Sequence, residues 1–416
     1  MYWILEVIYI LLNFLYLKGV ESKFYKINHI VFNNTKTQFC ISYNNGIKTF
    51  NSGDFHEKYS STDLGSISFS TIIHELNMVI FVGSENNEIY SNKKIVIYDL
   101  INNKDIYSTP FQKEITSLKT IDKYLIIGFK DELKIFSLEK KDTIIPVNEI
   151  PLENSDLYEI WDKSENELLS LTKIFLANVL KEGIIISTFV GNEWSLENKK
   201  EIKTPITKIQ NIFYIKKLNQ ILIPDETAYY IYGINPDDGK QTLCLYRGKN
   251  PGFITSITLL NKNYLAVNNL NRTIHIFDIG NNSNNYNISN MIGNFIYGNY
   301  ISPFMRIPYD KITKKNEGEF YESDFIKKGA ILDSEDEGIE LKIIAYNGYG
   351  YKLKINFLKK DFEIIAKEKL AKYKIYQEIE SSSNDNKETD IFSNYNSIFD
   401  QNKKEKKDEE KFVDFQ

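Results

Sequence analysis

The sequence is poor in the residues that build covalent or metal-bound scaffolds. Its 416 residues include only 2 cysteines, at positions 40 and 244, and 4 histidines, scattered at positions 29, 56, 74 and 275. Two cysteines cannot form a disulfide framework or a multi-thiolate metal site. The simplest interpretation is a protein of a reducing compartment, and we expect it to carry no metal.

Ready-made catalytic motifs are also missing. The strings HExxH, GxSxG, GxxxxGK[ST] and GxGxxG do not occur. These strings mark zinc proteases, α/β-hydrolases, phosphate-binding loops and dinucleotide-binding folds. No paired catalytic carboxylates can be named either. We therefore expect that the protein is not an enzyme and uses no cofactor.

The charge balance excludes a general polyanion-binding surface. The chain has 51 Lys and Arg residues against 56 Asp and Glu residues, a formal net charge of −5. It has no basic stripe, so nucleic acid is not an expected partner, and any phosphate recognition must be local. Hydrophobic residues make up 42% and charged residues 26%, which indicates a globular chain rather than a disordered one.

One long apolar run lies at the N-terminus. Residues 2–18 read YWILEVIYILLNFLYLK, with Glu6 and Asn13 inside the run. The run is slightly short for a bilayer span, and it lacks the positive n-region and small-residue cleavage site of a secretory signal. Three interpretations of residues 1–20 stay open: a signal or anchor, an amphipathic or buried element, and a non-essential extension or misassigned start.

From Phe24 onward, short apolar runs rich in Ile, Val, Tyr and Phe alternate with Asn, Gly, Asp and Lys, a pattern typical of strands. One apolar phrase occurs seven times; its first six copies end in an aromatic residue, and these ends are 38 to 53 residues apart. Its copies are GIKTF (46–50), KIVIY (94–98), ELKIF (132–136), GIIISTF (183–189), AYYIY (228–232), TIHIF (273–277) and the less regular YGYKLKI (349–355). A repeat of about 40–50 residues indicates a β-propeller with four strands per blade. Seven copies predict an all-β, seven-bladed, WD-repeat-like β-propeller over residues 21–376.

Some segments fit this pattern less well. An irregular pair of β-sandwiches is the alternative fold. The stretch 164–180 is either partly helical or a long blade strand. Residues 280–330 are expected to be a long insertion between the sixth and seventh copies, and residues 377–416, which are polar and of mixed charge, a disordered tail.

The segment 243–279 resembles the PROPPIN family, seven-bladed propellers that bind phosphoinositides in autophagy. It contains Leu245-Tyr246-Arg247-Gly248 where the family has F/L-R-R-G, and NNLNRTIHIF (268–277) where the family has a phrase like SSxKGTVHIF. The stretches FNNTKTQFCISYNNGIKTFN (32–51) and 92–138 are similar to the family's first three blades. The resemblance covers about residues 24–360 and implies two phosphoinositide pockets on the propeller rim.

The departures from the motif predict that the first pocket is weak or lost. Consecutive strand side chains point to opposite faces, so two adjacent arginines serve two pockets. Tyr246 replaces the first arginine and brings no charge. Asp225 and Glu226 lie where the family has an S-x-K-G-T-type turn, and their carboxylates would repel a phosphate.

The second pocket is better preserved. The resemblance assigns it Arg247, Thr273, Asn268, Asn269, Arg272 and Lys249. We expect the Arg247 guanidinium to face outward and hold the headgroup phosphate in a bidentate contact. Arg272 adds charge but also crowds the pocket. The alternative is that Arg247 only ties adjacent blades together and Thr273 is a turn residue. His275 is expected to be a packed strand residue.

The resemblance also implies that a loop between the outer strands of blade 6 inserts into the bilayer. In this chain the matching residues are Met291, Ile292, Phe295 and Ile296, whose spacing places them on one side of a helix formed at the interface. Gly293 argues against a stable helix before binding. The alternative, of equal weight, is that MIGNFIYGNY (291–300) is simply the next blade strand.

These observations lead to two function hypotheses. The first is a cytoplasmic, peripheral membrane adaptor in autophagosome formation. It would bind phosphatidylinositol 3-phosphate or the 3,5-bisphosphate on phagophore, endosomal or vacuolar membranes, and the family resemblance implies an autophagy lipid-transfer protein as its partner. The second is a propeller scaffold that has lost lipid binding. The apolar N-terminus leaves an anchor open in either case.

Overall fold

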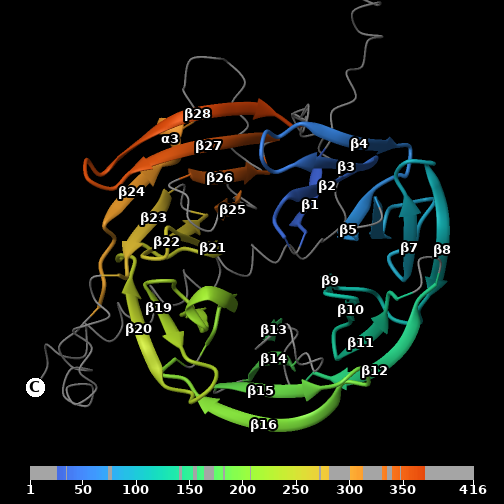
Figure 1. Ribbon diagram of the computed structural model, residues 1–416, viewed down its shortest axis with the longest axis horizontal. Helices are drawn as coiled ribbons and strands as arrows, with labels where there is room; N and C mark the ends of the chain where they lie inside the picture. The colour runs from blue at the N-terminus through green and yellow to red at the C-terminus, as the bar shows by residue number, and fades with distance from the viewer. Residues whose placement is uncertain are drawn as a thin grey trace, which may run out of the picture. The chain divides into compact units, whose positions relative to one another are not determined.

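The protein is a seven-bladed β-propeller, as the repeat predicts (Figure 1). The computed structural model describes residues 26–33, 35–73, 77–139, 143–152, 157–163, 173–180, 183–206, 208–270, 273–280, 300–312, 330–334, 340–346 and 348–370. Each blade is a four-stranded sheet whose strands follow one another along the chain, and each neighbouring pair is antiparallel. The alternative of two β-sandwiches is therefore wrong.

The first four blades contain sixteen strands. Blade 1 contains β1 (Ile27–Phe32), β2 (Gln38–Tyr43), β3 (Gly46–Asn51) and β4 (Glu57–Thr62). Blade 2 contains β5 (Ile67–Ile73), β6 (Met78–Gly83), β7 (Lys94–Asp99) and β8 (Lys104–Pro110). Blade 3 contains β9 (Ser117–Ile121), β10 (Tyr124–Gly128), β11 (Glu132–Ser137) and β12 (Ile145–Pro151). Blade 4 contains β13 (Tyr158–Lys163), β14 (Lys173–Leu180), β15 (Gly183–Val190) and β16 (Ser195–Lys203).

The last three blades include two short helical turns. Blade 5 contains β17 (Phe213–Ile215), the 3₁₀ turn η2 (Lys216–Leu218), β18 (Gln220–Pro224), β19 (Tyr230–Ile234) and β20 (Gln241–Tyr246). Blade 6 contains β21 (Ile254–Leu260), β22 (Tyr264–Asn269), β23 (Thr273–Asp278) and β24 (Met305–Pro308), and α3 (Tyr309–Ile312) follows it. Blade 7 contains β25 (Ala330–Ser334), β26 (Glu340–Ala345), β27 (Tyr349–Asn356) and β28 (Asp361–Lys369).

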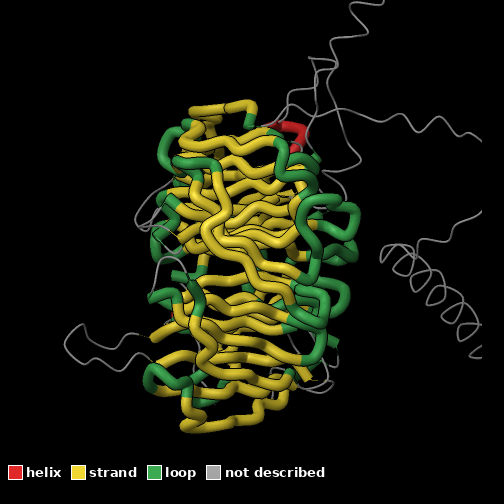
Figure 2. Tube along the Cα trace, turned by 90° about the vertical axis from the view of Figure 1, so that its right-hand side faces the viewer, coloured by secondary structure: helices red, strands yellow, loops and turns green. Residues whose placement is uncertain are grey.

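All seven copies of the repeated phrase form, or extend into, the third strand of their blade. They correspond to β3, β7, β11, β15, β19, β23 and β27. The second and third strands are apolar because neighbouring blades cover both of their faces, and every residue of β6 is buried. The outer strands lie at the perimeter of the ring, and β28 alternates half-buried and exposed positions over most of its length. Figure 2 shows the strands packed across the rim, with the turns gathered along its two sides.

Seven apolar clusters hold the ring together, one at each interface between blades. The cluster between blades 5 and 6, for example, contains Leu245 and Ile254, both fully buried. The cluster between blades 7 and 1 joins Ile344 and Leu370 to Phe39. At this interface the Tyr43 hydroxyl also donates to the Leu370 carbonyl at 3.2 Å. Blade 7 therefore closes the ring by packing its side chains against blade 1. Each of these two blades is formed by four consecutive strands, and neither takes a strand from the other.

The expected insertion at 280–330 needs correction. Met305–Pro308 pairs with β23 as the outer strand of blade 6, and α3 follows, so both lie inside the range assigned to the insertion. The 26 residues 279–304 separate this short strand from β23, so the regular spacing of the repeat did not reveal it. The outer strand of blade 6 is thus Met305–Pro308 and not MIGNFIYGNY, whose residues 291–299 lie outside the described residues.

Other expectations concern segments that the structure describes only in part. Within 164–180, Lys173–Leu180 is the blade strand β14, and residues 164–172 lie outside the described residues. Residues 1–20 and 377–416 also lie outside them. Among the residues that are described, no helix has the length and apolar character to cross a bilayer.

Candidate functional site

The motif Tyr246-Arg247-Gly248 lies where β20 ends and the chain crosses from blade 5 to blade 6. Consecutive side chains there point to opposite faces of the sheet. Tyr246 packs against its cross-strand neighbour Tyr230, with ring centroids 5.1 Å apart. Arg247 points to the other face, on the same side as Leu245, which packs against blade 6. The expectation that the two adjacent residues serve different faces is met.

Arg247, however, does not face outward. Its side chain is buried, with 3% of the residue exposed. Its Nε donates to the Ala228 carbonyl at 2.7 Å, and its Nη2 donates to the Asn250 carbonyl. Burial lowers the pKa of Arg247, whereas the Asp225 carboxylate acts in the opposite direction. The alternation of side chains along a strand correctly predicted the face of the sheet to which Arg247 points. It could not predict that Arg247 is buried, because the turn before β19 and the linker after β20 cover the guanidinium.

A second arginine lies beside this position, and sequence reasoning missed it. Arg306 on β24 is the cross-strand neighbour of His275 on β23. A Cβ atom added to Gly248 would lie 4.0 Å from Arg306 Nη2. Arg306 is exposed and forms no hydrogen bond or ion pair within the described part of the chain. Its guanidinium is therefore available to a ligand from solvent.

His275 lies near both arginines. The residue is 5% exposed, and its Nδ1 has no hydrogen-bond partner among the described residues. Its pKa is lowered to about 3, first by burial and then by the positive charges of Arg247 and Arg306. The imidazole is consequently neutral at pH 7. It is packed, as the sequence predicted, but it retains a polar atom without a hydrogen-bond partner among the described residues, near two guanidinium groups.

Asn268 and Asn269 are both fully buried on β22. Asn268 is engaged internally: its Nδ2 donates to Thr255 Oγ1 at 2.7 Å and its Oδ1 accepts from the Tyr309 hydroxyl at 2.5 Å. Asn269 Oδ1 accepts from the Phe253 amide at 3.1 Å, while its Nδ2 has no partner in the described structure. Of the two, only Asn269 retains a hydrogen-bond donor.

The remaining predicted pocket residues are placed less completely. Thr273 begins β23, opposite Asn269, and is half-buried. Lys249 is exposed in the linker. Arg272 and the four residues predicted to enter the membrane, Met291, Ile292, Phe295 and Ile296, lie outside the described residues.

One sequence signal could have found Arg306. The 51 Lys and Arg residues of the chain include only three arginines, Arg247, Arg272 and Arg306. The Arg306 guanidinium lies near Gly248, the residue that follows Arg247, and Arg272 directly precedes β23 in the sequence. A guanidinium is less strongly hydrated than an ammonium group and forms a planar fork that matches a phosphate. A chain that otherwise relies on lysine for its positive charges thus places two of its three arginines, Arg247 and Arg306, close together on the rim.

The turn before β19, which the sequence assigned to the first pocket, contains Asp225 and Glu226 and also contacts Arg247. Asp225 Oδ1 accepts from the Tyr229 amide at 2.9 Å and from Thr227 Oγ1 at 3.0 Å, so this carboxylate organises its own turn. Burial raises its pKa. Glu226 forms an ion pair with Lys208 at 2.9 Å. The position next to Tyr246 is occupied by aromatic rings rather than by cations.

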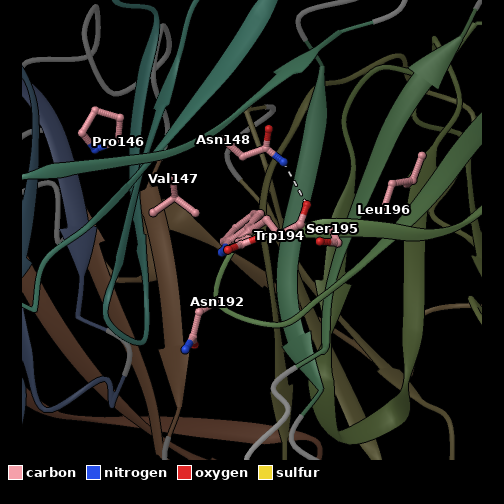
Figure 3. A pocket seen from close by; sticks show the side chains of 8 residues that line it. Pro146, Val147, Asn148, Asn192, Trp194, Ser195 and Leu196 are labelled. Carbon is pink, nitrogen blue, oxygen red and sulfur yellow. Dashed lines mark hydrogen bonds between the residues drawn. The ribbon is translucent and has the colours of Figure 1, made fainter.

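A separate hollow of about 530 Å³ lies between blades 3 and 4 (Figure 3). It is lined by β12, by the turn before β16 and by the start of β16, and Asn148 Nδ2 donates to the Trp194 carbonyl at 2.8 Å across it. None of the predicted phosphate-binding residues lines it. No cluster of side chains in the described ranges has the composition of a metal site.

Comparison with known proteins supports the fold. No protein-family model matches the chain. Hsv2 from Kluyveromyces marxianus is similar at 14% identity with a TM-score of 0.59, and Kluyveromyces lactis Hsv2 at 13% with a TM-score of 0.60. KlAtg21, solved in complex with the coiled coil of AgAtg16, is similar at 13% with a TM-score of 0.58. Each match covers 83% of this chain and 99% of the other. Hsv2 and Atg21 are PROPPIN structures, so the family resemblance is confirmed at the level of the fold.

Proposed function

We propose that this propeller is a divergent PROPPIN that acts as a peripheral membrane adaptor in autophagy and binds a phosphoinositide headgroup at the rim of blade 6. The phosphate would be held by Arg306, with His275 and Asn269 Nδ2 as further polar contacts. Arg247 would not contact the phosphate, but its buried positive charge would attract it. The ligand would be phosphatidylinositol 3-phosphate or the 3,5-bisphosphate.

The observation that carries this proposal is the grouping of arginine around an unpaired imidazole. Arg306 has no counter-charge in the described structure, and both guanidinium groups lower the pKa of His275. Two cations side by side cost electrostatic free energy, and a bound anion would remove this cost. A phosphate that pairs with Arg306 would gain a charge-assisted hydrogen bond of about 1.5–3 kcal/mol, which corresponds to about a tenfold to hundredfold difference in affinity.

The experiment is sedimentation of the full chain with liposomes that contain or lack phosphatidylinositol 3-phosphate. Arg306→Ala should weaken the lipid-specific binding by about tenfold or more. Lys58→Ala on β4 removes an exposed cation from the other side of the ring and serves as the matched control. Equal loss in both variants would indicate bulk charge rather than a pocket. Unchanged binding by Arg306→Ala would refute the assignment.

A scaffold without lipid binding is the second candidate, favoured by the burial of Arg247 against two carbonyls. In this case the protein partner would dominate, for example the expected lipid-transfer protein or a coiled coil like the one seated on KlAtg21. Exposed apolar side chains near the hollow between blades 3 and 4, such as Leu196 at 58% exposure, offer a contact surface. Complete absence of phosphoinositide preference in the wild-type liposome assay would select this candidate.

A further inference from the structure

The hollow between blades 3 and 4 has walls from two blades that face each other (Figure 3). Val147 on β12 packs against the apolar cluster between these blades, and the next residue, Asn148, pairs with Ile135 of the same cluster. Leu196 on β16 faces blade 3, since its cross-strand neighbour Phe189 also belongs to this cluster. A ligand in the hollow would therefore contact side chains of both blades.

The floor of the hollow is held in place by contacts between the blades. Trp194, in the turn between β15 and β16, is fully buried and packs edge-on against Tyr124, with ring centroids 5.3 Å apart. Asn148 donates to the Trp194 carbonyl, and the Tyr124 hydroxyl donates to Asn192 Oδ1 at 3.3 Å. The volume of about 530 Å³ lies within the range of about 300–1,000 Å³ that is typical of ligand sites. A ligand would enter a formed hollow and would not have to order its walls.

Exposed apolar side chains border this hollow. Among the described residues, seven large hydrophobic side chains are exposed, and two of the seven are Leu196 at 58% and Ile145 at 40%. Ile145 directly precedes the lining residue Pro146 on β12. It pairs with Ser137, two residues after Ile135 on β11, so it also points toward blade 4. Apolar side chains that gather on a surface beside a hollow are typical of a contact site.

The edge of β12 is unsuited to the addition of another strand. Pro146 has no backbone N–H group, and the register between β11 and β12 shifts between Ile135 and Phe136. Prolines and bulges of this kind protect the free edges of sheets from pairing. A ligand in the hollow would therefore be held by its side chains.

Glu193 brings an unbalanced negative charge to the hollow. It is an exposed lining residue, and it forms no hydrogen bond or ion pair within the described part of the chain. The carboxylates beside the hollow already have partners: Glu149 pairs with Lys134 at 2.6 Å, and Glu197 pairs with Lys173 at 3.3 Å. A cation from outside could approach Glu193 without displacing a lysine of this chain. Charge complementarity thus favours a basic ligand.

We propose that the hollow between blades 3 and 4 binds a short linear segment of another protein, in which an arginine or lysine lies next to aliphatic residues. Glu193 pairs with the cation, and Ile145, Val147 and Leu196 contact the aliphatic side chains. One exposed ion pair and a small apolar surface give a modest affinity, which suits a transient association. The inference goes beyond the proposed lipid binding and does not depend on it.

The first test is a selection of random octapeptides displayed on phage, with the full chain immobilised. The same library is selected in parallel on the double variant Glu193→Lys/Leu196→Ser, whose two substituted residues are exposed. The wild type should enrich peptides that combine basic and aliphatic residues, and the double variant should not. Enrichment of acidic peptides, or of no peptide that distinguishes the two proteins, would overturn the proposal.

The second test measures the affinity of the most enriched octapeptide by fluorescence polarisation. Glu193→Lys should weaken it by about fivefold, because repulsion replaces attraction, and Leu196→Ser by about threefold to tenfold. The Glu193→Lys protein should instead prefer the same peptide with glutamate in place of its basic residue. Glu363→Lys and Ile365→Ser are the matched controls, since they replace an exposed acid and an exposed isoleucine on β28, and they should change nothing. Equal losses in the controls would overturn the proposal, because they would indicate general surface attraction.

The third test locates the bound peptide. A benzophenone next to its basic residue should cross-link to residues 145–148 or 192–196, and cross-links found only elsewhere would overturn the proposal. Liposome sedimentation of Glu193→Lys should equal that of the wild type, whereas Arg306→Ala should keep its peptide affinity. Failure of the lipid assay would therefore refute the phosphate site alone, and failure of the selection would refute the peptide site alone.

Discussion

Substitution of Arg247 should affect stability, and substitution of the neighbouring Arg306 should affect ligand binding. Arg247 is buried and donates to two backbone carbonyls, whereas Arg306 is exposed and has no partner in the described structure. Arg247→Ala should therefore lower the free energy of unfolding, and Arg306→Ala should lower phosphate affinity at unchanged stability. This prediction separates a structural guanidinium from a ligand-binding one.

The magnitude follows from the environment of each acceptor. Ala228 is fully buried, so losing the Nε donor leaves its carbonyl without that hydrogen bond, at a cost of about 1–3 kcal/mol. Asn250 is exposed, and water can replace Nη2 at its carbonyl with little loss. Removing a buried cation recovers part of its solvation free energy, because burial lowers the pKa of Arg247. The net loss for Arg247→Ala should be about 2 kcal/mol.

The assay is urea unfolding followed by tryptophan fluorescence, combined with liposome sedimentation of the same samples. Arg306→Ala should change the unfolding free energy by less than about 0.5 kcal/mol, because it removes an exposed side chain without partners. Arg247→Lys should be intermediate, since one ammonium group cannot reach both carbonyls in the geometry of the fork. A fully stable Arg247→Ala protein with no phosphoinositide binding would refute the reasoning, because it would mean that the guanidinium leaves its carbonyls to contact the ligand.

Further predictions concern stability. The pKa of His275, about 3 in the folded state, lies below the ordinary 6.5, so only the unfolded chain takes up the proton as the pH falls. The contribution of His275 to the free energy of unfolding should be fully present above pH 6.5 and about 2 kcal/mol smaller at pH 5. His275→Gln should flatten this pH dependence in urea unfolding. Gly252→Ala would place its Cβ 2.3 Å from Asn269 Oδ1 and should lower the unfolding free energy by about 2 kcal/mol; a wild-type midpoint would contradict it. Tyr43→Phe removes the hydrogen bond to the Leu370 carbonyl and should lower the free energy of unfolding by about 1 kcal/mol in the same assay. The control, Tyr107→Phe on the outer strand of blade 2, should not change it.

The repeated strand was predictable because it is the most constrained element of each blade. A third strand such as β7, which contains KIVIY, is covered on both faces by neighbouring blades. Its backbone also pairs with a strand on each side, β6 and β8. A strand in this environment is stable with apolar, β-branched and aromatic residues, so the repeated apolar pattern can be recognised in the sequence. Seven such strands were enough to predict the architecture.

The outer strand of blade 6 was not predictable by the same logic. Met305–Pro308 has four residues, and Arg306 within it is exposed. A strand of this length carries too little periodicity to be recognised, and 26 residues of chain separate it from its partner β23. Arg306 therefore could not be connected with His275 until the pairing of β23 and β24 was known.

The sequence by itself determined the seven-bladed ring and the face to which each residue of the Tyr246–Arg247 pair points, because both follow from the two-residue period of a strand. Only the tertiary structure decided that Arg247 is buried against Ala228 and Asn250 while Arg306 is exposed next to it. The depth of a side chain depends on which distant segments cover it, and those segments come from a turn and a linker that no local pattern specifies.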